Sequence, residues 1–305
     1  MRVGIIGNGV HSKRMQKILG KKKINFFIYK PNNKKYYDRD DFDKLKKNKI
    51  IFILSPNNSH YNYIKALHKN RYIFCEKPPV GNKNQINKIK KINYKKIYFD
   101  YNSRFSRISE ILKIRKKYNL GKLIYANILS SHGLALKKEY KKNWRSNKKK
   151  CPKGVFEVVS IHWIDLINYH FKIAKLEKPN LLNHSKKGNS FDTSHIKLTL
   201  DNGGIVDIAT SYNAPLTKKI FFLFNNGTIE QNGTKLEIRG PAINLDKNKF
   251  FKKPKIISRY TVNENKDYQI SLEKSIDYFL KIVRKRRFFD KKLFMCSIKS
   301  NKLLF

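Results

Sequence analysis

Lys77 lies two residues after a short apolar segment in the stretch IIFILSPNNSHYNYIKALHKNRYIFCEKPPV, residues 50–80. Its two apolar runs, residues 50–54 and 72–75, predict strands, and the residues between them predict a helix. Polar residues leave each strand, and in an open parallel sheet such exits line the ligand crevice. Lys77 is therefore placed where a cation can act on a bound molecule, although a solvated loop lysine fits the same pattern in a chain this rich in lysine.

A second set of residues with a chemical use lies at the start of the chain. Residues 2–6 predict a strand that runs into Gly7-Asn8-Gly9-Val10-His11-Ser12 and then an amphipathic helix. This pattern is typical of loops that hold a pyrophosphate, because the first glycine permits a tight turn and the second lets the backbone approach the phosphates. Ser12 stands where glycine or alanine is usual, which makes the match less specific.

The choice between NAD and NADP depends on the end of the second predicted strand, residues 25–29. In NAD sites an acidic residue near this point accepts hydrogen bonds from the ribose. Here the strand ends in Tyr29-Lys30-Pro31, with no carboxylate. Lys30 can pair with the 2′-phosphate of NADP, or it is one more surface lysine, so both cofactors stay open.

The charge of the chain is strongly positive, with 68 Lys and Arg against 22 Asp and Glu in 305 residues, a net charge of +46. One interpretation is binding to nucleic acid or another anionic surface. The other is coding bias, because Lys, Asn, Ile, Tyr and Phe are all enriched and the lysines are spread along the chain. We favour coding bias and expect no nucleic-acid partner, although the field attracts anionic ligands in either case.

Hydropathy and cysteine content exclude several classes of protein. The hydrophobic content of 40% supports a folded core. The longest apolar runs, such as residues 50–54 and 220–224, are too short to span a bilayer, and the N-terminus reads as a strand rather than a signal peptide. We therefore expect a cytoplasmic protein with no membrane contact. Three widely spaced cysteines indicate neither a disulfide framework nor a metal site.

The pattern of predicted elements changes part-way along the chain. Strands and helices alternate up to about residue 118, which predicts a parallel α/β domain over residues 1–119. From residue 195 short strands separated by Asn-Gly-type turns predict an antiparallel sheet in a second domain, residues 120–305. The last clear helix is expected at about 268–285.

One histidine lies on a helix that the sequence predicts to be mostly buried, residues 154–171. Taken alone, His162 is more typical of a core residue than of a catalyst. Just before this helix, residues 135–153 are basic and irregular and predict a loop over a site, with Trp144 and Arg145 inside it.

Several motifs together resemble the glucose–fructose oxidoreductase and inositol dehydrogenase family (Gfo/Idh/MocA). They are GNG at 7–9, SPNNSH at 55–60, CEKP at 75–78, YNSRF at 101–105 and GVFEVVSIHWID at 154–165. The resemblance covers nearly the whole chain. It implies an α/β fold with an N-terminal Rossmann-type parallel sheet and a C-terminal α+β domain with a large, mostly antiparallel open sheet. It also implies a homo-oligomer, a dimer or tetramer.

The resemblance further implies hydride transfer between NAD or NADP and a hydroxyl-bearing carbon of a sugar or nucleotide sugar. The positions of Lys77 and His162 match the family's catalytic lysine and histidine. Both residues suit these roles, because histidine titrates near neutral pH and can take the hydroxyl proton, while a lysine stabilises negative charge on the substrate oxygen.

The remaining site residues are expected by the same resemblance and by their places at strand exits. Cofactor binding is expected of Gly7, Asn8, Gly9, Val10, Lys30, Ser55, Pro56, Asn57, His60, Glu76, Lys77 and Asn102. Substrate binding is expected of Lys77, Tyr101, Arg104, Trp144, Arg145 and Asp165. His60, at a helix start, can face a cofactor or be a partly exposed terminal residue.

The chain departs from the family at one position near His162. The family usually carries an aspartate four residues before the histidine, and here that residue is Val158. Glu157 is adjacent, but at 3.6 residues per turn it points about 100° away. Asp165 can orient the imidazole or make a structural hydrogen bond.

Three functions therefore stay open. The first is an NAD(P)-dependent sugar or nucleotide-sugar oxidoreductase, with surface polysaccharide synthesis as one pathway in which it can act. The second is a dinucleotide-binding relative whose catalysis is lost or altered, which Val158 favours. The third, a nucleic-acid-binding protein, predicts steeply salt-dependent binding to DNA or RNA.

Overall fold

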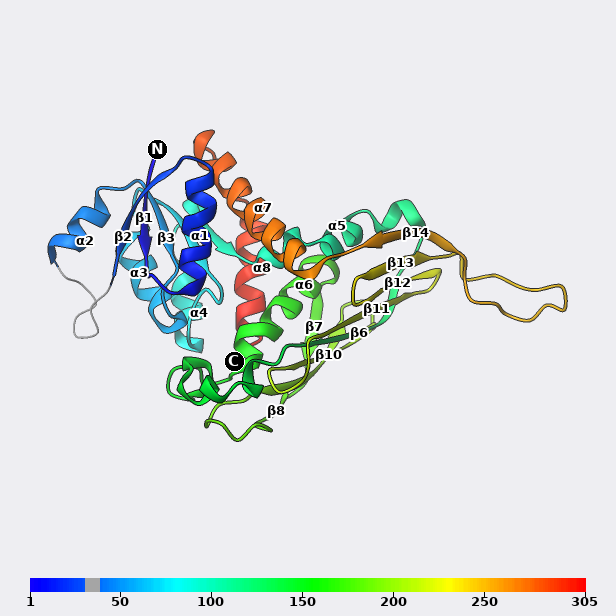
Figure 1. Ribbon diagram of the computed structural model, residues 1–305. Coiled ribbons are helices and arrows are strands. Elements are labelled where there is room, and N and C mark those ends of the chain that lie inside the picture. Colours follow the sequence, from blue (N-terminus) through cyan, green and yellow to red (C-terminus); the bar gives the residue numbers. More distant parts are fainter. Residues whose placement is uncertain (31–38) are drawn as a thin grey trace. The chain divides into compact units, whose positions relative to one another are not determined.

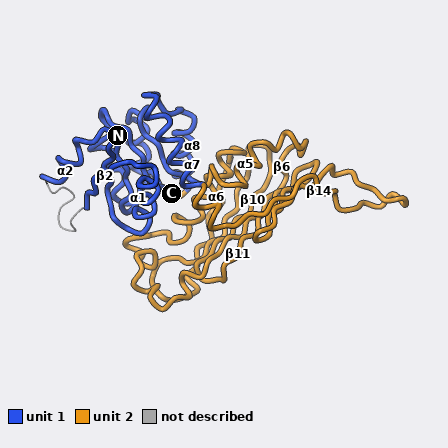
Figure 2. Tube along the Cα trace, turned by 45° about the horizontal axis from the view of Figure 1, so that its top comes forward, with its two compact units in different colours: residues 1–102, 271–303, 305 blue, residues 103–270, 304 orange. Residues whose placement is uncertain are grey.

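The structure is a computed structural model that describes residues 1–30 and 39–305. By its internal contacts the chain divides into two compact units, coloured separately in Figure 2. The first contains residues 1–102, 271–303 and 305, and the second contains residues 103–270 and 304. The C-terminal residues 271–303 are thus grouped with the first unit by their contacts, and the predicted domains of residues 1–119 and 120–305 stay a prediction. Pro31, which follows the second predicted strand, lies outside the described residues.

The first unit is built on a five-stranded parallel sheet (Figure 1). Its strands lie in the order β2-β1-β3-β4-β5 and comprise β1 (Arg2–Ile6), β2 (Asn25–Tyr29), β3 (Ile50–Ile53), β4 (Tyr72–Glu76) and β5 (Ile97–Asp100). Every residue of β3 and β5 is buried, as expected of parallel strands with both faces covered. The strand order reverses between β1 and β3, and ligands of open α/β sheets bind at such a switch point. The predicted Rossmann-type sheet is confirmed.

Helices pack on this sheet from both ends of the chain. They are α1 (Val10–Lys21), α2 (Arg39–Lys46), α3 (His60–Leu67), α4 (Lys83–Lys90), α7 (Glu264–Arg284), which begins in the second unit, and α8 (Lys291–Lys302). The buried ring of Phe279 in α7 makes edge contacts with the stacked rings of Phe52 and Phe74, at centroid distances of 5.4 and 5.3 Å. This aromatic packing explains why the C-terminal segment belongs with the first sheet.

The second unit is dominated by one nine-stranded sheet. Its order is β14-β13-β12-β11-β6-β10-β9-β7, and β8 pairs with β9. The strands are β6 (Leu123–Ser131), β7 (Ile173–Leu176), β8 (Asn180–Leu182), β9 (Thr193–Leu200), β10 (Ile205–Ser211), β11 (Thr217–Phe224), β12 (Gly227–Asn232), β13 (Lys235–Arg239) and β14 (Ile256–Thr261). Only the pairing of β6 with β10 is parallel among the described pairs, so the predicted mostly antiparallel sheet is confirmed.

The helices of the second unit are α5 (Arg107–Lys113) and α6 (Ile161–Phe171). The helix predicted at 154–171 is in fact two segments, because residues Phe156–Ser160 form a π-helical turn directly before α6. The Ile161 N–H bonds to the Phe156 carbonyl oxygen, five residues back. A π turn of this kind leaves no periodicity that a 3.6-residue pattern detects. None of the helices in the described residues is long and apolar enough to cross a membrane.

Candidate active site

The glycine-rich loop follows β1 at the switch point of the first sheet. Gly7 has a φ of +102°, and a Cβ there would lie 2.6 Å from the Leu54 carbonyl oxygen, so the turn requires glycine. Ser12 is fully buried, and its Oγ donates a hydrogen bond to the Gly7 carbonyl oxygen over 2.8 Å. The serine at the third motif position therefore stabilises the loop.

Gly9 borders open space at the N-terminus of α1. A Cβ on Gly9 would meet no heavy atom within 4 Å, and its φ of −73° is available to any residue. Gly9 caps α1 without a side-chain hydrogen bond, and a helix N-terminus leaves backbone N–H groups without intrahelical partners. Asn8 accepts a hydrogen bond from Gln16 Nε2 over 3.2 Å, and Val10 is 72% exposed. The loop has the room and the donors that a pyrophosphate uses.

Lys30 is exposed and comes directly after β2. It therefore occupies the strand end at which dinucleotide sites contact the ribose. Its pairing with a 2′-phosphate stays a prediction.

His60 connects the loops that follow β3 and β4. Its Nδ1 lies 2.8 Å from the Pro78 carbonyl oxygen and its Nε2 lies 2.9 Å from that of Ser55. The ring is fully buried, and burial lowers the pKa of His60. Because its ring nitrogens face backbone carbonyls, His60 positions both loops. Pro56 and Asn57 lead into the 3-10 turn Asn57–Ser59 of the first of these loops, and direct cofactor contacts of this segment stay predictions.

Lys77 leaves the end of β4 with its side chain only 8% exposed. The loop after it is fixed by Asn301 of α8. The Val80 N–H donates to Asn301 Oδ1 over 2.8 Å, and Asn301 Nδ2 donates to the Val80 carbonyl oxygen over 3.2 Å. Helix α8 therefore helps to hold the loop of Lys77, a role that the sequence did not reveal.

Three titratable groups meet at this edge of the sheet. His11 Nε2 lies 2.5 Å from Glu76 Oε1. A ring nitrogen of His11 and one carboxylate oxygen each of Glu76 and Asp100 all lie within 4.8 Å of one another. Burial opposes the charge on His11, but the Glu76 carboxylate outweighs burial and the pKa of His11 is raised. Burial, reinforced by the charge of Glu76, raises the pKa of Asp100 to about 7. The folded sheet therefore makes Asp100 a weaker acid than an exposed aspartate.

The same three side chains are of the types that hold a metal ion, although the short contact between His11 and Glu76 is itself that of an ion pair. The prediction of a site without metal thus stays a prediction. The sequence showed no ligand cluster because His11 lies after β1 and Asp100 ends β5, so only the folded sheet brings them together.

Tyr101 and Asn102 leave β5 and are tied to the C-terminal helices. Tyr101 is fully buried, with its hydroxyl 3.5 Å from the Ser297 carbonyl oxygen. Asn102 Nδ2 donates to Ser271 Oγ over 2.7 Å. These contacts give both residues a packing role, and their expected contacts with substrate and cofactor stay predictions.

Arg104 and Asp165 form a bidentate ion pair within the second unit. Arg104 donates from Nε to Asp165 Oδ2 over 2.7 Å and from Nη2 to Oδ1 over 2.6 Å. The two side chains are 2% and 0% exposed. Since both oxygens of Asp165 bind the guanidinium, the observed role of the pair is to hold α6 against residues 103–105. Substrate contacts of either residue stay predictions.

His162 lies in the first turn of α6 and is half-buried, whereas Ile161 and Trp163 beside it are buried. Its backbone carbonyl oxygen accepts a hydrogen bond from Ser103 Oγ over 3.3 Å. The approach to this helix requires Gly154, which has a φ of +54° and whose Cβ would lie 1.8 Å from the Phe191 carbonyl oxygen. His162 is therefore held on an ordered helix with part of its side chain accessible.

The π turn changes the geometry of the residues before His162. The expectation that Glu157 points about 100° away assumed 3.6 residues per turn, and this assumption does not hold through Phe156–Ser160. Because a π turn contains one residue more, Glu157, five residues before His162, moves toward the position that Val158 would take in a regular α-helix. One Glu157 oxygen accepts a hydrogen bond from the Lys153 N–H over 3.2 Å.

Val158 packs in an apolar environment. It contacts a cluster of buried residues that includes Tyr140, Val155 and Tyr212. The side chain at this position therefore contributes to apolar packing.

Trp144 and Arg145 lie together in the irregular segment before α6. The Arg145 guanidinium carbon is 4.4 Å from the centroid of the Trp144 ring, a cation–π arrangement. Both side chains are half-buried. Burial, with the charge of Arg145 as a smaller cause, lowers the pKa of His132. The segment is therefore ordered, and its expected substrate contacts stay predictions.

Two family models match consecutive parts of the chain. Residues 1–97 match the oxidoreductase family with an NAD-binding Rossmann fold, and residues 109–239 match the Gfo/Idh/MocA C-terminal domain. The chain belongs to the Gfo/Idh/MocA family. It is thus an oxidoreductase with an NAD-binding Rossmann domain, as the motifs predicted.

Solved structures of this family share the fold at low sequence identity. An oxidoreductase from Agrobacterium radiobacter in complex with NAD⁺, L-tartaric acid and magnesium is 15% identical, with a TM-score of 0.76 over 100% of this chain and 94% of that one. Levoglucosan dehydrogenase with NADH and levoglucosan is 14% identical, with a TM-score of 0.77 over 99% and 94%. A myo-inositol dehydrogenase from Corynebacterium glutamicum is 14% identical, with a TM-score of 0.71 over the same shares. No curated protein sequence matches the chain.

Proposed function

We propose that this oxidoreductase transfers hydride between NAD(P) and a hydroxyl-bearing carbon of a sugar or nucleotide sugar, with Lys77 and His162 as catalytic residues. The observation that carries the proposal is that one sheet edge presents both the open backbone at Gly9 and the largely buried Lys77. A dinucleotide whose pyrophosphate lay at Gly9 would supply the hydride acceptor. Backbone N–H groups at the start of α1 would bind its phosphates.

The proton and the charge of the reaction are assigned to the two side chains. Oxidation of an alcohol removes the hydroxyl proton as the C–H hydride leaves, and the His162 imidazole accepts that proton. The Lys77 ammonium stabilises the negative charge that develops on the oxygen, and it does so well because it is shielded from water. In the reducing direction the same two groups return the proton and polarise the carbonyl.

Glu157 is proposed as the positioning residue for His162. This assignment rests on the extra residue of the π turn, since Glu157 then takes about the position that Val158 would have in a regular α-helix, while Val158 packs against the apolar cluster. A carboxylate near an imidazole raises its pKa and fixes its orientation. Glu157→Gln should therefore shift the pH profile of kcat/KM to lower pH and lower kcat, whereas an unshifted profile would limit Glu157 to its bond with the Lys153 N–H.

The variants Lys77→Ala and His162→Asn test whether these two residues are catalytic. Lys69→Ala is the control, because it removes an exposed lysine of the same unit as Lys77. Substrate is sought by screening sugars and sugar nucleotides for a change in nicotinamide absorbance. Each catalytic substitution should lower kcat by roughly 100-fold or more, and His162→Asn should leave cofactor affinity little changed. Unchanged kcat in Lys77→Ala would remove the assignment.

The second candidate function is dinucleotide binding with lost or altered catalysis, favoured by Val158. It predicts saturable cofactor binding without turnover of any sugar or sugar nucleotide. A role in polysaccharide synthesis in the cytoplasm and assembly into a homo-oligomer are further parts of our proposal. The positive field of the chain supports an anionic substrate, and the mass of the native protein by light scattering tests the assembly.

A further inference from the structure

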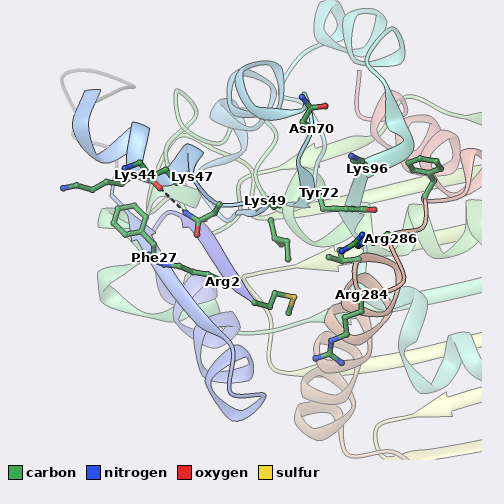
Figure 3. A pocket seen from close by; sticks show the side chains of 15 residues that line it. Arg2, Phe27, Lys44, Lys47, Lys49, Asn70, Tyr72, Lys96, Arg284 and Arg286 are labelled. Atoms are coloured by element: carbon green, nitrogen blue, oxygen red, sulfur yellow. Dashed lines mark hydrogen bonds between the residues drawn. The ribbon is translucent and has the colours of Figure 1, made fainter.

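A cleft of about 1170 Å³ lies in the first unit, away from the glycine-rich loop (Figure 3). Its lining includes Arg2, the first residue of β1, Tyr72, the first residue of β4, and Lys49 and Lys96, which directly precede β3 and β5. The cleft therefore borders the amino ends of four parallel strands. The glycine-rich loop and Lys77 follow the carboxyl ends, at the opposite edge of the sheet, so the cleft is a separate site.

The cleft concentrates positive charge. Seven of its 15 lining residues are Lys or Arg, and none of the 15 is acidic. In the whole chain 68 of 305 residues are Lys or Arg, so their share in the lining is about twice as high. Lys44 pairs with Asp41 over 3.3 Å. Within the described part of the chain, the other six lining cations form no ion pair with a carboxylate: Arg2, Lys47, Lys49, Lys96, Arg284 and Arg286.

Coding bias toward lysine does not account for this arrangement. Three of the 13 arginines in the chain line the cleft, and two of them, Arg284 and Arg286, come from the basic segment VRKRRF at 283–288, where α7 ends. Figure 3 shows Arg284, Arg286 and Lys96 on one wall and Arg2 and Lys47 on the other. Like charges on facing walls repel one another, and a bound anion relieves that repulsion.

We propose that this cleft binds a polyphosphate group, carried by a nucleotide or by inorganic polyphosphate. Guanidinium groups bind phosphate oxygens in pairs, and lysines add point charges, so a chain of phosphates can bridge the two walls. The volume is larger than one phosphate needs and is of the size of small-molecule sites. Phe288 also lines the cleft, is 54% exposed and offers a ring against which a nucleotide base can stack.

Isothermal titration calorimetry with inorganic tripolyphosphate, ATP and AMP tests the proposal. The protein is saturated with NADH so that the dinucleotide site is filled, and the salt is kept at about 0.15 M to screen non-specific binding. We expect one binding site for tripolyphosphate and much weaker binding of AMP. If ATP binds more tightly than tripolyphosphate, the ligand of the cleft is a nucleotide. If the two affinities are equal, the ligand is inorganic polyphosphate.

Matched variants localise the binding. Lys47→Gln/Lys49→Gln removes two exposed lysines from the cleft, and Lys88→Gln/Lys90→Gln removes two exposed lysines of α4 outside it. The cleft variant should lose roughly tenfold in affinity for tripolyphosphate, with the control near wild type and NADH binding unchanged in both.

Three results would overturn the proposal. They are an absence of saturable tripolyphosphate binding, an equal loss of affinity in both double variants, and a single-stranded oligonucleotide that binds more than about 100-fold more tightly than tripolyphosphate. The last result would identify a nucleic-acid surface. Because NADH binding is measured on the same samples, a failure of the dinucleotide site is recognised separately.

Discussion

Replacing Asp100 by asparagine should stabilise the protein at alkaline pH and have little effect at acid pH. Asp100 is 1% exposed, lies beside Glu76 and accepts a hydrogen bond from Ser275 Oγ over 2.5 Å. Burial, then the charge of Glu76, raises its pKa from an ordinary 3.8 to about 7. The folded state therefore holds this proton more tightly than the unfolded state, and the stability it contributes is lost as the pH rises from about 4 to about 7.

The size of the effect follows from the pKa difference. The difference is about three units, and each unit corresponds to 1.36 kcal/mol, so the ceiling is about 4 kcal/mol. The proton is shared with His11 and Glu76, so we expect the measured effect to lie below this ceiling. The amide introduced by Asp100→Asn keeps an oxygen for Ser275 but cannot ionise, so the advantage of the variant grows with pH.

Urea unfolding at pH 4, 6 and 8, followed by circular dichroism, measures this advantage. The control is Asp40→Asn, which removes an exposed carboxylate from α2 of the same unit. The free energy of unfolding of Asp100→Asn should exceed that of the wild type at pH 8 and equal it within error at pH 4. A pH-independent difference, or a variant less stable than the wild type at pH 8, would refute the reasoning.

Three further substitutions test other parts of the account by urea unfolding. Asp165→Asn leaves the Arg104 guanidinium buried without its counter-charge and should cost about 3–5 kcal/mol, and a loss below about 1 kcal/mol would contradict a buried ion pair. Phe279→Ala opens a cavity against the first sheet and should cost about 3–5 kcal/mol. A much smaller loss would contradict the packing of α7 in that core. Asn301→Ala leaves two backbone groups of Val80 unpaired and should cost about 1–3 kcal/mol, with a fall in activity if α8 positions the loop of Lys77.

Local patterns were enough to predict most of the fold. The strands of the first sheet were visible as short apolar runs between turn residues, and the Asn-Gly turns at 225–227 and 232–233 marked hairpins that the structure contains. Helix α8 was missed because four of the five apolar residues in its sequence KKLFMCSIKSNK are consecutive and show no helical spacing, and it is ordered by packing against a distant part of the chain. Strands β7, β8 and β14 were missed because they are short or carry exposed residues.

The candidate site was predictable only where its residues are close in sequence. The glycine-rich loop and Lys77 follow strand ends, which a pattern can locate. The cluster of His11, Glu76 and Asp100 arises from the order of the strands in the sheet, and no spacing in the sequence reports that order. The π turn before His162 was equally invisible, because a single extra residue in a helical turn leaves apolar and polar positions that still read as a helix.

The central claim is that the glycine-rich loop binds a nicotinamide dinucleotide, and Gly9→Val tests it most directly. Its new side chain would occupy open space beside the loop, so the fold should tolerate it while the pyrophosphate is excluded. Gly20→Val is the control, since a Cβ there also meets no atom within 4 Å but lies at the far end of α1. Fluorescence titration with NADH and NADPH should show saturable binding of at least one cofactor by the wild type and the control, and at least tenfold weaker binding by Gly9→Val. No saturable binding by the wild type, or equal affinity in Gly9→Val, would contradict the account.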